Sequence, residues 1–412
     1  MLIDPDHPLT QTTLSKSAKT FRQLSIYWLA LGGFAVGTEA FVISAILPDI
    51  SADLAVSIQA TGDLVAVFAF TYALSSPILT ALTGAFDRRK LLMWSMAAFA
   101  GANVCAAIAP GYQPLVIARV LLAVCAGLYM PSANALAGAL VPPERRGRAL
   151  ASVAGGTSLA VALGVPLGAY IGTRFGWRMT FVGVAVLSII ALLGLLLGLR
   201  NGIGSGLPST NLRDRLAVIR IKGVPSTLMT TTLWATGGYT VYTYLAPYLM
   251  AVSGIEPHYL GYLYFVYGAA AFLGLLAGGA ASDRVGPARV IGIKLGLLAT
   301  ALVSLSVWAR FLTPTQALVP VLISMIFWAF NAWGFLPTQQ SRLIGIAGLK
   351  TAPVILSLNA SFMYLGFSMG AALGSFTLSR GSVADLGWVG ALSVLASLSL
   401  FWATRYRSRI PS

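Results

Sequence analysis

Residues 28–47 read WLALGGFAVGTEAFVISAIL, a run of twenty residues in which Glu39 carries the single formal charge. A helix of about 20 apolar residues is long enough to cross the hydrocarbon core of a bilayer. An ionisable side chain inside such a helix is costly unless it faces a partner or a wet cavity, so Glu39 is a candidate functional residue. The alternative, which applies equally to Arg119 in the apolar run 115–129, is that the side chain extends to the nearer membrane interface.

The composition of the chain points to a membrane protein. Its 412 residues are 57% hydrophobic and 9% charged, whereas soluble domains carry about 25% charged residues. The net charge of +15 falls in short clusters between apolar runs, so no continuous basic face is available for nucleic acid. Cys105 and Cys125 lie within apolar runs, and His7 and His258 stand outside any metal-ligand spacing. We therefore expect a polytopic membrane protein with no metal, no cofactor and no nucleic-acid partner.

Twelve apolar segments reach the length of a membrane span. They are residues 25–47, 60–82, 91–109, 114–138, 149–171, 179–199, 225–249, 259–281, 290–309, 317–339, 352–378 and 387–404. The most polar interval, Arg200–Lys222, divides them six and six. The sequence predicts an all-α membrane protein with twelve transmembrane helices in two six-helix, pseudo-symmetric bundles. Its predicted parts are an N-terminal tail (1–24), a first bundle (25–199), a linker (200–224), a second bundle (225–404) and a C-terminal tail (405–412).

The distribution of basic residues predicts the orientation. Of the 27 Lys and Arg residues, 22 fall on the side that holds both termini and the linker, and four fall on the opposite side. Basic residues concentrate in cytoplasmic loops. We therefore predict a multi-pass protein of the lipid bilayer whose termini and linker are cytoplasmic.

The loop after the eighth span has a pattern typical of a conformational latch. Residues 279–289 read GAASDRVGPAR, with Asp283 and Arg284 followed by Gly286 and Arg289. A cytoplasmic helix end presents partial negative charge, and a short Asp/Arg turn can fasten it to a neighbouring helix in one conformation. The alternative is an ordinary positively charged loop. The corresponding first-half loop, TGAFDRRK at 83–90, departs from this pattern.

The fifth span carries small residues at 156, 160, 164, 168 and 172, which lie on one helical face. Such a face lets another helix approach closely or slide. Pro166 lies inside this ridge, between Gly164 and Gly168. We expect the ridge to form a close, moving contact between the two halves.

These motifs resemble those of the major facilitator superfamily. Residues 279–289 are similar to the second-half copy of its cytoplasmic loop signature, and Gly164–Gly168 resembles the antiporter signature of its exporters. GTEAFVI at 37–43, followed by LPDI at 47–50, resembles the first span of the proton-coupled drug and sugar efflux permeases. The resemblance covers essentially the whole chain. It implies the major facilitator fold in a bacterial inner membrane.

In similar exporters an acid of the first span and an arginine of the fourth line the central cavity, and the acid binds the proton or a cationic substrate. The resemblance therefore implies these roles for Glu39 and for Arg119, which lies in the apolar run 115–129. The two residues lie at compatible depths, about 12 Å and about 8 Å from the same side. An acid near a guanidinium in a low-dielectric site can gain and lose a proton as its cavity alternates. Asp63 is a second coupling candidate, with a solvated helix-end acid as its alternative.

Aromatic and amide side chains within the spans are candidate substrate contacts, together with Glu39. A mid-membrane amide is costly unless it meets a partner or a cavity. The candidates are Tyr129, Asn134, Trp234, Tyr239, Tyr242, Trp328, Asn331, Asn359 and Tyr364. If the substrate and the proton bind at overlapping positions, each excludes the other, as exchange requires.

The function that the sequence favours is secondary active transport, with proton-coupled efflux of a small organic solute such as a drug, sugar derivative or nucleoside. A proton-coupled uptake symporter is the alternative within this class, and a non-transporting membrane sensor is the alternative outside it. No span contains the paired carboxylates or Ser/His pair that an enzyme would need. We expect a monomer whose partners are its small-molecule substrate, protons and the surrounding lipid.

Overall fold

The computed structural model describes residues 8–84, 86–142, 145–199 and 212–407, which are helical and contain no strand. The first bundle contains α1 (Pro8–Val42), η1 (Ile43–Ala45), α2 (Leu47–Asp53), α3 (Ile58–Leu82), α4 (Arg88–Ala107), α5 (Tyr112–Ala139), α6 (Arg146–Leu159), η3 (Ala160–Gly164), α7 (Val165–Phe175) and α8 (Trp177–Gly198). The second contains α10 (Val224–Tyr242), α11 (Leu245–Ser253), η4 (Pro257–Tyr259), α12 (Leu260–Val285), α13 (Pro287–Phe311), α14 (Pro314–Ala347), η5 (Leu349–Thr351), α15 (Ala352–Arg380), η6 (Val383–Asp385) and α16 (Leu386–Arg407).

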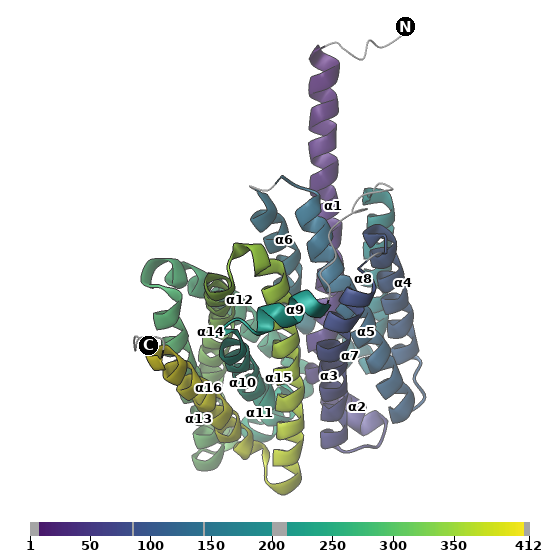
Figure 1. The fold of residues 1–412 in the computed structure, drawn as a ribbon. Coiled ribbons are helices and arrows are strands. Elements are labelled where there is room, and N and C mark those ends of the chain that lie inside the picture. Colours follow the sequence, from purple (N-terminus) through teal and green to yellow (C-terminus); the bar gives the residue numbers. More distant parts are fainter. Residues whose placement is uncertain (1–7, 85, 143–144, 200–211, 408–412) are drawn as a thin grey trace.

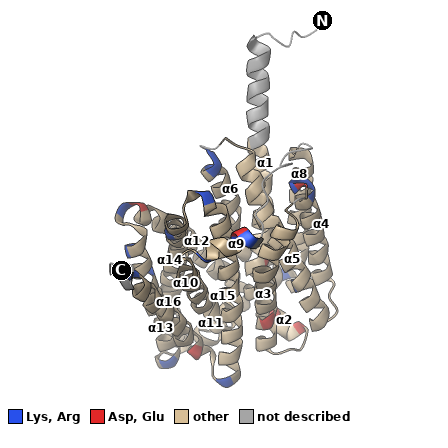
Figure 2. Cartoon of the chain, viewed as in Figure 1, with Lys and Arg blue, Asp and Glu red and all other residues tan. Residues whose placement is uncertain are grey.

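The predicted all-α membrane fold is confirmed. Eleven helical segments of the described residues are long and apolar enough to cross a membrane. Most charged residues lie towards the ends of the helices and leave the middle of the bundles largely uncharged (Figure 2). The first helix extends the predicted span back to Pro8, whereas residues 1–7, 408–412 and the linker residues 200–211 lie outside the described part.

The predicted seventh span, 225–249, is divided between α10 and α11. This division explains why twelve spans are predicted and eleven membrane-length helical segments are found among the described residues. The chain leaves the α-helical path at Thr243 and Tyr244. Threonines lower the hydropathy of α10. Their hydroxyls nevertheless form hydrogen bonds within the helix, as where the Thr240 hydroxyl donates to the Thr236 carbonyl at 2.8 Å. The first span has a corresponding break at η1, between α1 and α2.

The two bundles stand side by side (Figure 1). Between them, α3 packs along α15, and α12 packs against η3 and α7. Within the predicted linker, Leu212–Ile219 form a short helix, α9, that contacts both α3 and α15. We call the end at which α10 begins the linker face, and the end that carries α2 and η6 the opposite face.

At the opposite face, each bundle has an aspartate that accepts hydrogen bonds from one tryptophan and one arginine. In the first bundle Asp53 receives the indole N–H of Trp177 at 3.1 Å and the guanidinium of Arg178, which also donates to the Ala109 carbonyl at 3.1 Å. In the second, Asp385 receives the indole N–H of Trp388 at 3.0 Å and the guanidinium of Arg310. The repeated arrangement supports a structural repeat between the halves.

We predict that the link at Asp53 weakens in acid. Hydrogen bonds from Arg178 and Trp177 hold the pKa of Asp53 below its ordinary value. A lowered folded-state pKa stabilises the protein above the unfolded pKa of about 3.9, and this contribution is lost as the pH falls through the folded pKa. Asp53→Asn should therefore lower the melting temperature of the detergent-solubilised protein at pH 7, with the difference shrinking at the acid end of a pH series. An equal difference at every pH would contradict this assignment.

The glycine ridge of the fifth span faces α1 rather than the second bundle, so the expected contact between the halves is wrong. A Cβ atom added at Gly164 would meet the Thr38 side chain, and one added at Gly168 would meet Val42. The corresponding ridge on α15 at Gly366 and Gly370 packs against α10 in the same way. Both ridges therefore hold pairs of helices together within a bundle.

The opposite side of the fifth span meets the second bundle through glycines of α12. A Cβ atom added at Gly268 would meet the Val161 carbonyl and Ala162, and one added at Gly261 would lie 3.3 Å from the Pro166 carbonyl. This part of the span includes η3, a π-helical turn. Pro166 lacks the N–H that would bond to the residue four positions earlier, and a π turn is one way to accommodate it. At this contact, the backbone of α12 lies directly against the backbone of the fifth span.

Gly268→Ala should push α12 away from the fifth span, at a cost of about 1–3 kcal/mol for overpacking. The matched control is Gly296→Ala, because nothing lies within 4 Å of a Cβ atom added there. Thermal unfolding of the purified protein should show a lower melting temperature for Gly268→Ala and an unchanged or higher one for the control, since alanine favours helix. Equal changes in melting temperature for the two substitutions would mean that the interface accommodates the added methyl group without overpacking.

Candidate functional site

Glu39 of α1 and Arg119 of α5 form an ion pair inside the first bundle, and both side chains are 0% exposed. The Arg119 Nη1 contacts Glu39 Oε1, while its Nε donates to the Leu64 carbonyl of α3 at 3.2 Å. The guanidinium also lies 4.4 Å above the ring of Phe68. The pair therefore joins three helices. The pairing expected from the depths of the two residues is present.

The ion pair has unused hydrogen-bonding capacity. Glu39 Oε2 and Arg119 Nη2 are buried and have no hydrogen-bond partner among the described residues. Buried charged groups usually satisfy such atoms, because leaving them unpaired is costly. An acid with a free oxygen beside a guanidinium can accept a proton or a polar ligand when the bundle opens.

A layer of aromatic rings, contributed by both bundles, adjoins the ion pair. The ring of Tyr364 stacks on Tyr72 at 3.8 Å and lies 6.4 Å from Phe68, the ring under Arg119. Phe367 follows at 5.3 Å from Tyr364 and stacks on Tyr239 at 3.7 Å. The layer runs from α3 across the bundle interface to α10 and α15.

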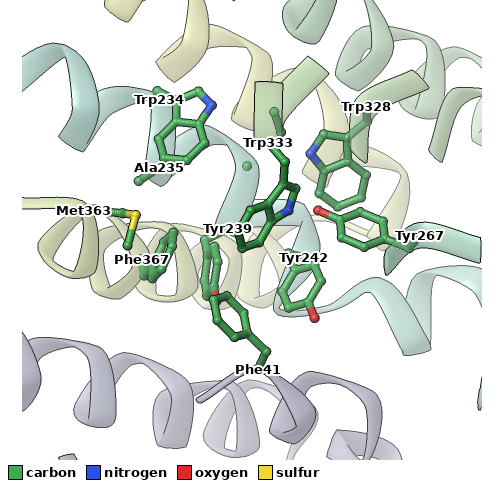
Figure 3. A pocket seen from close by; sticks show the side chains of 12 residues that line it. Phe41, Trp234, Ala235, Tyr239, Tyr242, Tyr267, Trp328, Trp333, Met363 and Phe367 are labelled. Atoms are coloured by element: carbon green, nitrogen blue, oxygen red, sulfur yellow. The ribbon is translucent and has the colours of Figure 1, made fainter. Parts of the chain in front are cut away.

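Beyond this layer lies a cavity, walled mainly by aromatic side chains (Figure 3). Its lining residues are Phe41, Trp234, Ala235, Gly238, Tyr239, Tyr242, Tyr267, Trp328, Ala332, Trp333, Met363 and Phe367. All except Phe41 belong to the second bundle. The Phe41 ring reaches the cavity from α1 and lies 5.8 Å from Trp333 and 6.2 Å from Tyr242.

The nine predicted substrate contacts other than Glu39 divide into two groups. Trp234, Tyr239, Tyr242 and Trp328 line the cavity, and Tyr364 lies beside it in the aromatic layer. The remaining four lie elsewhere in the bundles.

Tyr129 donates to the Leu29 carbonyl at 3.0 Å and so fastens α5 to α1. Asn359 accepts a hydrogen bond from Thr231 at 2.8 Å, while Asn331 accepts one from Lys294 at 3.2 Å. Asn134 is half-buried and does not line the cavity. These polar groups have partners or positions apart from the cavity, so packing explains them as well as ligand binding does.

The 22 basic residues assigned to the linker side include Lys294. It lies instead within α13 and is buried, with its ammonium 4.1 Å above the Phe330 ring. Its position therefore contributes nothing to the loop charge, although the imbalance of basic residues remains large without it.

Asp63 is separate from the ion pair. It is exposed near the start of α3 and lies within hydrogen-bonding range of Ser375 on α15. The Gln59 side chain, one turn earlier, donates to the Leu378 carbonyl of α15 at 3.3 Å. Asp63 therefore belongs to a polar contact between the bundles near the opposite face.

The predicted latch lies at the α12–α13 turn on the linker face. Asp283, Arg284 and Arg289 are exposed, and none of the ion pairs of the described residues includes them. Gly286 adopts a φ of +84° at the turn, which a side chain would strain.

The first-half loop, which departs from the latch pattern, makes several contacts. Asp87 accepts a hydrogen bond from the Lys90 amide at 3.0 Å and caps α4. Arg89 donates to the Leu199 carbonyl at 2.8 Å, at the end of α8. In this conformation the first-half loop ties helix ends together and the second-half motif does not.

Sequence reasoning missed Phe41, Tyr267, Met363 and Phe367 as lining residues. Phe41 follows Glu39 by two positions, so it projects from the other side of α1 and gave no signal as a ligand contact. The other three are ordinary apolar or aromatic residues of a membrane span.

Two helical bundles, with a buried ion pair inside the first and a cavity between the two, are the architecture expected of a multi-pass membrane transporter. A model of the Major Facilitator Superfamily matches residues 29–338. The chain belongs to this superfamily.

Relatives along most of the chain are named as transporters or as a resistance protein. The chain is 36% identical over 383 residues to an uncharacterized MFS-type transporter, YbcL, of Bacillus subtilis (strain 168), covering 91% of this chain and 95% of that one. It is 31% identical over 353 residues to the inner membrane transport protein YdhP of Escherichia coli (strain K12), covering 86% and 88%. A chloramphenicol resistance protein of Streptomyces lividans is 29% identical over 389 residues, covering 94% and 97%. These relatives indicate a transporter rather than an enzyme.

A solved structure shares the fold. A bacterial homologue of the human lysosomal transporter Spinster, in an inward-facing and unoccupied conformation, superposes with a TM-score of 0.73 at 19% identity, covering 95% of this chain and 99% of that one.

Removing one member of the ion pair should destabilise the protein more than removing both charges. Glu39→Gln leaves Arg119 buried without a counter-charge, which typically costs about 3–5 kcal/mol. Glu39→Gln/Arg119→Gln removes that uncompensated charge and should recover much of the melting temperature in detergent. A double variant that melts at or below the single variant would contradict this reading.

Proposed function

We propose that the protein is a secondary active transporter that exports a small organic solute in exchange for protons, by alternating access. The observation that carries the proposal is the buried Glu39–Arg119 pair, which has unpaired polar atoms and adjoins an aromatic layer and a cavity. Glu39 takes the proton, and Arg119 stabilises the carboxylate form. The name of the Streptomyces relative supports efflux of an organic compound.

The proposed location is the bacterial inner membrane, with both termini and the linker in the cytoplasm. The excess of basic residues on the linker side supports this orientation, and the name of the Escherichia relative supports the membrane. We propose a monomer, because the cavity and the ion pair are both built within one chain.

In this orientation, the described contacts fit an inward-facing conformation. Close contacts between the bundles occur on the opposite-face half, where Gly261 meets Pro166 and Gly62 meets Tyr244. The absence of ion pairs at Asp283 and Arg284 among the described residues fits a latch that is open in this state. Closing it would accompany the outward-facing state.

The test is proton-driven transport in proteoliposomes with an imposed pH gradient. Chloramphenicol is a suitable first solute because of the named relative. Glu39→Gln and the double variant Glu39→Gln/Arg119→Gln should both lose uphill flux, since neither has a titratable acid at the site. Downhill exchange can persist because it does not require the proton.

The matched control is Glu256→Gln, since this carboxylate is 72% exposed in the loop before η4. The control should transport at the parental rate. Near-parental uphill flux in the folded double variant would remove Glu39 from the coupling mechanism.

A further inference from the structure

The cavity in the second bundle has a chemical character distinct from that of the ion pair. Eight of its twelve lining residues are aromatic, and none of them is charged. Glu39 is 0% exposed and does not line the cavity. A ligand in this cavity therefore meets flat apolar faces rather than a formal charge.

Three hydrogen-bonding groups of the lining are buried and unpaired. They are the indole N–H groups of Trp234 and Trp328 and the hydroxyl of Tyr242, none of which has a partner among the described residues. The residues are 6%, 1% and 2% exposed, respectively. Indole N–H is a donor only, and a phenol hydroxyl can donate. Buried donors normally have acceptors, so these three can serve acceptors supplied from outside. The cavity volume in this conformation is about 30 Å³, so it must widen as the bundles move to admit a ring system.

The surroundings explain why these donors remain available. The Tyr267 hydroxyl lies within hydrogen-bonding range of Trp333. The Trp328 nitrogen faces Gly238, lying 3.9 Å from where a Cβ atom would stand, so the missing side chain leaves space in front of it. Figure 3 shows Trp328, Tyr242 and Trp234 arranged around the same cavity, on different sides of Trp333 and Tyr239.

This arrangement discriminates between ligand classes. A cation would gain from the ring faces but would find three donors and no carboxylate. An anion would lose its hydration without meeting a cation. A purely apolar ligand would leave the three donors unpaired. A neutral ring system with carbonyl or similar acceptors can stack on the aromatic faces and also accept hydrogen bonds.

We propose that this cavity binds neutral, flat aromatic solutes that carry hydrogen-bond acceptors, and that Trp234, Trp328 and Tyr242 donate to those acceptors. The inference rests on the proposed transport function and specifies its substrate class. It places the solute apart from Glu39, so exchange arises from coupled movement of the bundles rather than from overlapping binding positions.

The first test compares four two-ring compounds of similar size by equilibrium dialysis with the purified protein. Coumarin is neutral and carries acceptors, naphthalene has none, N-methylquinolinium is a cation and 1-naphthoate is an anion. Coumarin should bind about tenfold more tightly than naphthalene, the ratio expected for one or two neutral hydrogen bonds. It should also bind more tightly than either ion. Preference for the cation or the anion, or equal binding of coumarin and naphthalene, would overturn the proposal.

The second test removes each donor while keeping a ring in place. Trp234→Phe, Trp328→Phe and Tyr242→Phe should reduce the coumarin preference over naphthalene, with the combined variants approaching equal binding. The matched control is Trp402→Phe, because Trp402 is 50% exposed on α16 and does not line the cavity. An unchanged preference in all three variants would overturn the assignment of the donors.

These binding measurements are independent of transport. Coumarin preference that depends on the three donors, in a protein without proton-driven flux, would sustain the inference about the cavity and contradict the proposed coupling. Proton-driven flux of an organic cation, with no coumarin preference, would sustain transport and overturn the inference. The wild-type ligand series remains decisive even if a variant fails to fold.

Discussion

The burial of Arg119 and Glu39 is the constraint on which the first bundle depends. Two charges removed from water are tolerated only when each compensates the other and polar neighbours take up the remaining atoms. Here the compensation is incomplete, because Arg119 also uses the Leu64 carbonyl and the Phe68 ring but retains one unpaired nitrogen. The positions of α1, α3 and α5 are therefore linked to the charge state of one acid.

The two bundles share a scaffold but differ in chemistry. Both contain a small-residue ridge that brings a pair of helices together, a break in the first helix of the repeat, and an Asp/Trp/Arg cluster at the opposite face. The charged pair occurs in the first bundle, whereas eleven of the twelve cavity residues occur in the second. Repetition of the scaffold thus leaves the interior of each bundle free to take a different role.

Sequence reasoning succeeded where a single physical scale decides the outcome. Hydropathy located the spans, and counting residues from the span ends brought Glu39 and Arg119 to similar depths. It failed where the outcome depends on which face of a helix meets which neighbour. The sequence of the ridge at Gly164 and Gly168 would be the same whether the ridge packed against α1 or against α12. Only the packed structure shows that its partner is α1. Phe41 became a cavity residue for the same reason, since its role depends on the second bundle.

If Glu39 binds the proton and the cavity binds the solute, as proposed above, the position of Phe41 offers a physical route between the two sites. Residues two apart on a helix point to nearly opposite sides, so Glu39 faces Arg119 while Phe41 faces the second bundle. The α-helix ends at Val42, where η1 begins, so both side chains lie within one turn of a break in the span. A change in the charge of Glu39 alters what holds α1 against α5, and any rotation or shift of α1 then moves Phe41 in the cavity wall. In the proposed mechanism, the first span thus transmits protonation of Glu39 to the solute site without direct contact between the two.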